Sequence, residues 1–207
     1  AKIVNLLINY DQPITSPKTS LKLNGPRMGA SMTFGENGKR LQESESNGGF
    51  DMFPVVSQFG WQFEAQYMSE GDFQGLIESI FMIGGLEDGR MIPSFTFLNG
   101  FRFSKSGWEF GFGPSFRLIR KADGFYDTDG IMGGDNGDWY LANEYQAHQW
   151  QDSTMPLINP YDVSSRLDSR GQLKLSTGLV LAVGKTFKSG YLNVPVNLYV
   201  SPRKEGT

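Results

Sequence analysis

Apolar and polar side chains alternate along much of the chain. In the segment QFGWQFEAQY, residues 58–67, every second residue from Phe59 to Tyr67 is apolar, and the residues between them are Gln, Gly or Glu. Successive side chains of a β-strand point to opposite faces, so this segment predicts a strand with one apolar and one polar face. Comparable patterns occur at 27–34, 93–103, 108–118, 172–184 and 191–200, and residues 75–83 are a buried-looking apolar run with Glu78 at its centre. The sequence therefore predicts an all-β protein with seven visible strands.

The length of these segments bears on what the apolar face touches. Several of them are 10 to 13 residues long. Strands of soluble proteins average about 5–6 residues, whereas a tilted strand that crosses a membrane needs about 9–11. Strand length therefore favours lipid as the environment of the apolar face.

The connections between the predicted strands alternate in length. Short turns at 68–73, 104–107 and 187–190 alternate with longer links, of which 119–171 is the longest. Outer-membrane barrels have short periplasmic turns and longer extracellular loops. We therefore expect an antiparallel up-and-down transmembrane β-barrel of about eight strands, with a long extracellular loop at 119–171.

The strand count leaves the closure of the barrel open. We expect an eighth strand beyond Thr207, and the alternative is that residues 2–10 close the seam. We divide the chain into a periplasmic or barrel-associated segment, 1–26, and the barrel itself, 27–207. Pro114 and Pro195 fall inside predicted strands, where proline removes a ladder hydrogen bond, so we expect a β-bulge at each.

Composition narrows the classes of function. The net charge of −3 gives no electrostatic reason to expect nucleic-acid binding. The chain has no cysteine, which excludes disulfides and thiolate metal sites. No stretch approaches the roughly 18–20 apolar residues of a membrane-spanning helix. The chain starts at Ala1 without a leader, and we expect any signal peptide to have been removed.

Four phrases carry a resemblance to a known family. They are LNGPRMG, SQFGWQFEAQY, FMIGGLEDG and SRLDSRGQLKLSTGLVLAVGKTFKSGYLNVPVNLYVSP. Over residues 20–118 and 164–203 the chain resembles a family of outer-membrane β-barrel proteins from Bacteroidota that has no assigned biochemical activity. The resemblance implies a barrel fold, an outer-membrane location and one further carboxyl-terminal strand. It implies nothing about chemistry.

The predicted faces assign side chains to lipid or to the barrel interior. We expect the lipid-facing wall and its aromatic girdle to include Phe59, Trp61, Phe63, Tyr67, Phe103, Trp108, Phe110, Phe112 and Phe187. We expect the polar faces to place a charged cluster in the lumen: Arg27, Glu64, Glu78, Arg102, Glu109, Arg117 and Lys174. Tight hairpins would put Arg102 opposite Glu109 and Glu64 opposite Glu78.

The charged cluster has two interpretations. It is either a plug of ion pairs that fills a narrow barrel, or an acid/base site or ion path. We favour the plug, because a barrel of about eight strands is filled by its own side chains and an unpaired buried charge is costly.

The long loop holds the remaining candidate residues. Asp123, Asp127, Asp129, Asp135 and Asp138 offer oxygen ligands for Ca²⁺, although solvated turns use the same residue types. The aromatic residues Trp139, Tyr140, Tyr145 and Trp150 either contact a glycan or a partner protein, or fold the loop onto the barrel rim. The single histidine, His148, lies near Asp152 and Ser153, and we expect it to be a surface residue rather than part of a lipase site.

These features predict a non-enzymatic outer-membrane barrel that acts as a structural anchor or accessory subunit and displays a long extracellular loop. Its expected partners are outer-membrane lipid and other outer-membrane proteins, within a larger complex, and no cofactor is expected apart from the candidate Ca²⁺. The alternatives are a soluble lipocalin-like barrel that binds an apolar ligand, an outer-membrane lipid-modifying enzyme, and a narrow channel.

Overall fold

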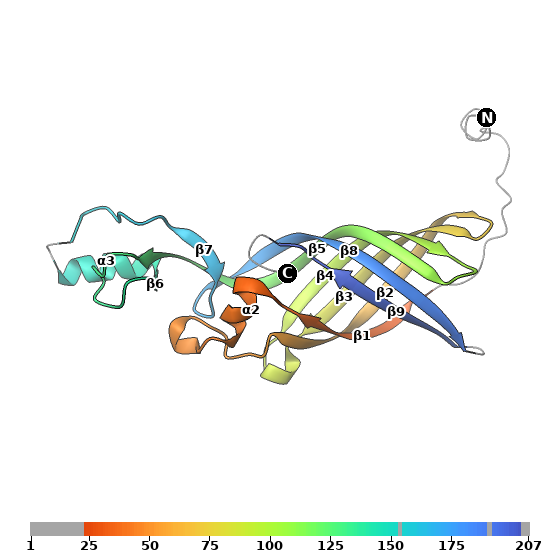
Figure 1. The fold of residues 1–207 in the computed structure, drawn as a ribbon, viewed down its shortest axis with the longest axis horizontal. Coiled ribbons are helices and arrows are strands. Elements are labelled where there is room, and N and C mark those ends of the chain that lie inside the picture. The colour runs from red at the N-terminus through yellow and green to blue at the C-terminus, as the bar shows by residue number, and fades with distance from the viewer. Residues whose placement is uncertain (1–22, 153–154, 190–191, 204–207) are drawn as a thin grey trace, which may run out of the picture.

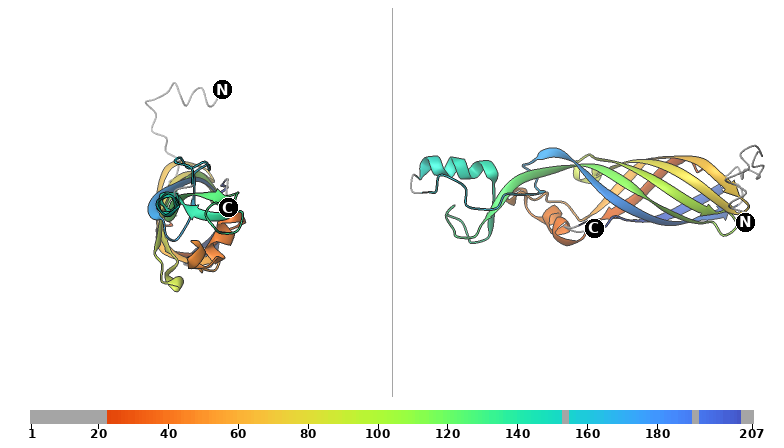
Figure 2. Two further views of the ribbon diagram at one scale, coloured as in Figure 1. Left: turned by 90° about the vertical axis from the view of Figure 1, so that its left-hand side faces the viewer. Right: turned by 90° about the horizontal axis from the view of Figure 1, so that it is seen from above.

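One antiparallel sheet dominates the fold. The computed structural model describes residues 23–152, 155–189 and 192–203. Seven strands form the sheet in the order β1-β2-β3-β4-β5-β8-β9, and the sheet is strongly curled into a half-barrel (Figures 1 and 2). Their bounds are β1 Gly25–Met32, β2 Val55–Glu70, β3 Phe73–Gly84, β4 Ile92–Phe103, β5 Trp108–Asp127, β8 Gln172–Ser189 and β9 Leu192–Val200. Each strand therefore pairs with its neighbour in the meander, as the alternation predicts.

The two edges of the sheet are β1 and β9. Within the described part of the chain no ladder joins them. The eighth strand is expected beyond Thr207 and stays a prediction, and residues 2–10, the alternative closing segment, lie outside the described residues. Three strands are much longer than predicted, since β2 has 16 residues, β8 has 18 and β5 has 20.

The two prolines do not mark β-bulges, so that prediction is wrong. Pro195 pairs with Thr186 in constant register on the edge strand β9, where a missing N–H costs no ladder bond on the open side. Pro114 pairs with Leu179 of β8, and on its other side the ladder to β4 pauses and resumes in the same register. The register shifts instead between Gln66 and Met68 of β2.

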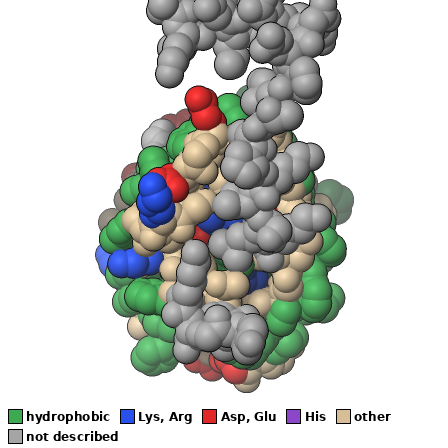
Figure 3. Space-filling model, turned by 90° about the vertical axis from the view of Figure 1, so that its right-hand side faces the viewer, with side chains coloured by type: hydrophobic (Ala, Val, Ile, Leu, Met, Phe, Trp, Pro, Cys, Tyr) green, Lys and Arg blue, Asp and Glu red, His purple; other side chains and the backbone are tan. Residues whose placement is uncertain are grey.

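The sheet is polar inside and apolar outside. Its inner face buries Gln62, Gln74 and Arg102 completely, while phenylalanine side chains of the same strands are exposed on the outer face. Figure 3 views the sheet from the end of its tight turns, with hydrophobic side chains around the periphery and charged side chains within the ring. The interior also contains a small apolar cluster of buried side chains, Ile80, Leu98 and Val180.

The links at the opposite end of the sheet contain short helices. The 35–54 link holds α2 (Gly35–Gln42) and the 3-10 turn η1 (Glu45–Asn47), and the next long link holds η2 (Leu86–Asp88). Phe50, Met52, Val56 and Leu167 form an apolar cluster that covers this end of the sheet. No helix within the described ranges is long and apolar enough to cross a membrane.

The predicted loop 119–171 is largely a folded projection with strands and a helix of its own. Strand β5 continues to Asp127 and pairs there with β6 (Asp138–Leu141) and β7 (Ser164–Leu167). Helix α3 (Ala142–Gln151) follows β6, and the whole unit extends beyond the sheet (Figure 1). We call residues 121–167 the arm. Its own core consists of Phe125, Met132, Tyr145 and Met155.

Candidate functional site

Arg102 is the centre of the charged layer inside the sheet. Its side chain is completely buried, and its Nη1 donates to Glu64 Oε1 at 2.8 Å while Nη2 donates to the other oxygen of Glu64. Its Nε donates to Glu109 Oε1 at 2.7 Å, and the hydroxyl of Thr186 donates to the same oxygen at 2.6 Å. Such charge-assisted, partly bidentate contacts are the strong class of hydrogen bond. We call Glu64, Glu78, Arg102, Glu109 and Thr186 the lumen cluster.

The register of the strands assembles this cluster. Arg102 lies opposite Glu109, and Glu64 lies opposite Glu78, as the hairpin geometry predicts. Arg102 of β4 also reaches Glu64 of β2, although β3 lies between them in the sheet, because the curl turns both side chains toward the same interior. Thr186 was not predicted; it comes from β8, where Lys185 pairs with Trp108 next to Glu109.

Of the other three predicted lumen residues, Arg27 lies within electrostatic range of Glu78, whereas Arg117 and Lys174 lie apart from the cluster. Arg27 donates to Gln62 Oε1 at 2.7 Å, and Lys174 forms an ion pair with Asp123 at 2.9 Å near the base of the arm. Arg117 lies on β5 opposite Ser176, toward the arm end of the sheet. The structure therefore divides the expected set of seven along the length of the sheet.

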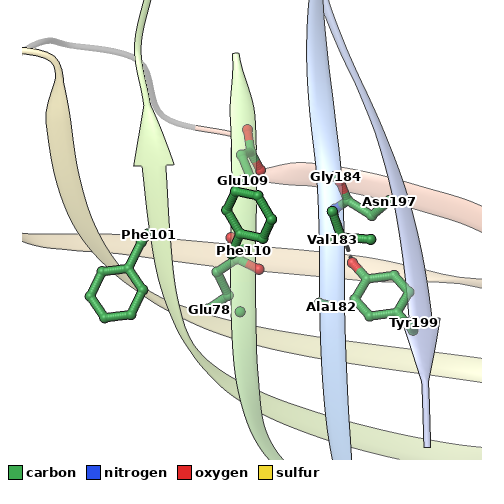
Figure 4. A pocket seen from close by; sticks show the side chains of 10 residues that line it. Glu78, Phe101, Glu109, Phe110, Ala182, Val183, Gly184, Asn197 and Tyr199 are labelled. Atoms are coloured by element: carbon green, nitrogen blue, oxygen red, sulfur yellow. Dashed lines mark hydrogen bonds between the residues drawn. The ribbon is translucent and has the colours of Figure 1, made fainter. Parts of the chain in front are cut away.

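Little space remains beside the lumen cluster. A cavity of about 10 Å³ is lined by Glu78, Glu109, Asn197 and Tyr199, among residues of β3, β4, β5, β8 and β9 (Figure 4). That volume is about the minimum that a single water needs. The layer can hold opposite charges together and exclude solvent, but it offers no room for a substrate.

The predicted lipid-facing side chains all lie on the outer face. Their exposed fractions run from 41% for Phe103 to 53% for Phe63, and the set consists of Phe59, Trp61, Phe63, Tyr67, Phe103, Trp108, Phe110, Phe112 and Phe187. Neighbouring rings contact one another across the strands, as in the pair Phe81–Phe95 at a centroid distance of 4.6 Å. The outer wall is therefore a continuous apolar surface rather than a set of isolated residues.

The aspartates predicted as calcium ligands have separate contacts. Asp127 accepts the backbone N–H groups of Asp129, Ile131 and Met132, and the hydroxyl of Tyr161 at 2.8 Å. Asp123 pairs with Lys174, and Asp138 accepts the N–H of Asp135. Among the residues that the structure describes, no three acidic or histidine side chains are grouped to hold a metal ion.

Hydrogen bonding sets the protonation of Asp127. Its burial by itself would raise the pKa, but the backbone N–H groups and Tyr161 stabilise the carboxylate, and the net pKa lies below the ordinary value. Burial, followed by the bond to Asp127, raises the pKa of Tyr161. Asp127 is thus an anionic anchor that folds the 127–132 turn.

Three of the four predicted contact aromatics fold the arm. Tyr145 is buried in the arm core, Tyr140 stacks on Phe125, and Trp139 donates its Nε1–H to Asp168 at 3.2 Å. Trp150, at the end of α3, is 90% exposed. The structure therefore assigns most of this aromatic set to packing and leaves Trp150 available for contact.

A cleft of about 560 Å³ lies between the arm and the α2–η1 segment. Helix α2 supplies Arg40 to it, β5 and β6 supply Tyr126 and Trp139, α3 supplies His148, and β7 with its following turn supplies Arg166 and Arg170. We call this the arm cleft. The three arginines were missed, although the closely spaced charges of SRLDSRG, residues 165–171, were a visible signal for two of them.

His148 faces this cleft and not the lipid-facing wall. Its ring meets Tyr140 edge-on at a centroid distance of 6.5 Å. Asp152 follows it at the end of α3, while Ser153, the third residue of the lipase alternative, lies outside the described residues. The described geometry therefore offers no assembled nucleophile beside this histidine.

Comparison with protein-family models, with curated proteins and with solved structures returns no significant match to this chain. The resemblance to the Bacteroidota barrel family consequently stays a prediction, and the function has to be argued from the geometry of the sheet, the lumen cluster and the arm.

Proposed function

We propose that this chain is a non-enzymatic outer-membrane β-barrel protein that anchors the arm at the cell surface as an accessory subunit. The observation that supports the proposal is the inverted polarity of the sheet. A buried Arg–Glu network fills the inner face, and a wall of exposed aromatic and aliphatic side chains covers the outer face. Exposing such a wall to water is unfavourable, whereas contact between the wall and the lipid of a bilayer is favourable.

The dimensions of the strands agree with a bilayer. At about 3.3 Å per residue, the 20 residues of β5 extend roughly 65 Å, about twice the hydrocarbon core of about 30 Å. The first part of β5 would cross the membrane and the rest would enter the arm. Tyr67, Phe103, Trp108 and Phe187 lie beside the tight turns, where an aromatic girdle would meet the periplasmic interface.

The far end of the arm offers a surface for a partner. Trp150, Leu157 and Ile158 are 90%, 91% and 82% exposed, which is unusual for side chains of this size. A larger outer-membrane assembly could bind the chain there while the sheet remains in lipid. This surface favours the accessory role over that of a bare structural barrel.

The rival functions fit the interior less well. A soluble lipocalin-like barrel would need an apolar ligand cavity, but the fully buried Arg102 and Gln62 face inward and the adjacent space is about 10 Å³. That narrow space also disfavours a channel. A lipid-modifying enzyme centred on His148 would need its reactive groups at the lipid boundary, and His148 lines the arm cleft.

Heat modifiability tests the proposal. The full chain, extracted from membranes with detergent, should migrate faster in SDS gels before boiling than after it, because a closed barrel resists SDS. Proteinase K added to intact cells should cut near Leu157, and added to permeabilised cells it should additionally cut the periplasmic turns. A chain that dissolves in buffer without detergent and shows no shift would mean that the outer wall does not face lipid.

A further inference from the structure

Arg166 is a buried cation without a full charge partner. Its side chain lies over the ring of Trp139 at 4.0 Å, and the residue is only 9% exposed. The nearest carboxylate, Asp168, is 4.0 Å away, and its oxygens already accept four hydrogen bonds of 2.9–3.2 Å from Arg170 and Trp139. The buried Nε of Arg166 has no hydrogen-bond partner. A buried guanidinium with so little negative charge beside it would be stabilised by a bound anion.

Arg40 brings a second cation to the same point. Its Nη2 donates to the hydroxyl oxygen of Tyr126 at 3.1 Å, and Nη1 of Arg166 donates to the same oxygen at 3.2 Å. Two guanidinium groups thus converge on one neutral phenol. Burial, together with the charge of Arg40, lowers the pKa of Arg166, which reports the same shortage of negative charge.

The carboxylates that line the arm cleft are already engaged. Glu43 accepts a hydrogen bond from Arg40, Glu144 caps α3 by accepting the N–H of Leu141, and Asp138 accepts the N–H of Asp135. Arg40 is thus paired with Glu43 through its Nη1, while its Nη2 and the Nη1 of Arg166 lie beside the Tyr126 hydroxyl at the wall of the cleft. An anionic group of a ligand would fit there with charge-assisted hydrogen bonds.

The rest of the lining fits a sugar ring. Tyr126, Trp139, Tyr140 and His148 supply flat rings, and Asn47, Ser46 and Gln151 supply amide and hydroxyl groups beside them. Rings of this kind pack against the C–H face of a saccharide while the polar groups bind its hydroxyls. A volume of about 560 Å³ lies within the usual 300–1,000 Å³ of small-molecule sites.

We propose that the arm cleft binds an acidic saccharide, with the carboxylate or sulfate of the sugar held between Arg40 and Arg166 and the ring against the aromatic wall. A free inorganic anion would use the two arginines but not the rings, and a neutral sugar would use the rings but not the arginines. The inference goes beyond the anchoring function and does not depend on membrane insertion.

The test uses the detergent-purified full chain on an array of saccharides that carry uronic acid, sialic acid or sulfate groups, printed beside their neutral parents. Selected pairs, such as cellobiouronate and cellobiose, are then titrated calorimetrically, with sodium sulfate as a ligand that lacks the ring. At least one acidic saccharide should bind about tenfold or more tightly than both its neutral parent and sulfate, because a charge-assisted hydrogen bond contributes more than that factor. Binding should weaken as salt increases.

Variants locate the binding in the arm cleft. Arg40→Gln and Arg166→Gln should each weaken the acidic saccharide about tenfold or more and leave the neutral parent unchanged. Arg120→Gln removes an exposed cation of β5 that is not among the lining residues and serves as the matched control. Because Arg166 also packs on Trp139, near-ultraviolet circular dichroism is used to check that Arg166→Gln folds like the wild type. If its spectrum is altered, the conclusion rests on Arg40→Gln.

Three results would overturn the proposal. The first is that no acidic saccharide on the array binds more tightly than its neutral parent. The second is that sulfate binds as tightly as the acidic saccharide. The third is that both arginine variants bind the acidic saccharide as tightly as the wild type does. Heat modifiability is measured on the same preparation, so a failure of saccharide binding and a failure of the barrel proposal are recorded separately.

Discussion

The sheet and the arm of this chain have opposite distributions of polar and apolar side chains between inside and outside. The arm is built like a soluble protein, with Phe125, Tyr145 and Met155 inside and side chains such as Asp129, Asp135 and Gln151 outside. The sheet has Arg102 and Gln62 inside and phenylalanines outside. Both regions share strand β5, so one continuous strand passes from one arrangement to the other near Lys121. The point where the polarity reverses marks where we expect the environment to change from lipid to water.

Loss of the central arginine should have the largest effect. Arg102→Met leaves Glu64 and Glu109 buried without their cation, and removing one partner of a buried pair costs about 3–5 kcal/mol of stability. Urea unfolding in lipid vesicles measures this loss as the difference in free energy of unfolding between the variant and the wild type. Lys105→Met, which removes an exposed cation paired with Asp72 two residues after β4 ends, is the matched control and should change stability by less than about 1 kcal/mol. Equal losses of stability in the two variants would contradict the conclusion that Arg102 is the buried partner of Glu64 and Glu109.

Truncation in the arm core should unfold the arm and spare the sheet. Phe125→Ala removes a fully buried ring that stacks on Tyr161 at 5.0 Å, and such truncations cost about 3–5 kcal/mol. Amide hydrogen exchange should rise across 138–167 and stay unchanged across 58–67. If the heat-dependent gel shift disappears as well, the two regions do not have separate cores.

A charge on the outer wall distinguishes lipid from water directly. Leu181 of β8 lies opposite Phe112 in the middle of the apolar wall. Leu181→Arg should destabilise the protein in vesicles by about 2–4 kcal/mol, as a cation near the bilayer midplane does. Leu157→Arg introduces the same charge at an exposed position of the arm and should change stability by within about 0.5 kcal/mol. If Leu181→Arg leaves the stability unchanged, the soluble lipocalin-like barrel is favoured.

Acid should loosen the arm before it affects the sheet. The pKa of Asp127 is lowered in the folded state, so its carboxylate contributes stability that is complete above the unfolded pKa of about 3.9. That contribution is lost as the pH falls through the lower folded value. Near-ultraviolet thermal melts between pH 2 and 6 should show the decline, and Asp127→Asn should remove it. Asp129→Asn, in the same turn, is the control and should leave the decline in place.

Regular alternation made the sheet predictable. Each strand from 27–34 onward follows from side chains that change face at every residue, and a tight turn at 104–107 is enough to pair Arg102 with Glu109. The contact between Arg102 and Glu64 was only partly foreseeable, because it depends on how far the sheet curls across β3. Pairing between neighbours follows from sequence, whereas contacts across the interior follow from curvature.

The arm and its cleft were not predictable in the same way. The second half of β5, RKADGFYD, residues 120–127, does not alternate cleanly, because its partners β6 and β7 lie in the arm rather than in the sheet. The weak compensation of Arg166 depends on Asp168 being occupied by Arg170, which no spacing rule reveals. Arg40 joins them from a helix that lies more than one hundred residues earlier in the chain.

The continuity of β5 also decides how this molecule would respond to a mechanical load. The ladder bonds of antiparallel strands run perpendicular to the strand axis, so tension along β5 would load its pairs with β8, from Trp108 to Lys121, at the same time. Strands β6 and β7 pair with β5 through only four residues each, so fewer ladder bonds would share the same tension there. A partner that pulls on the arm would therefore strip its outer strands first and leave the strand that enters the sheet in place.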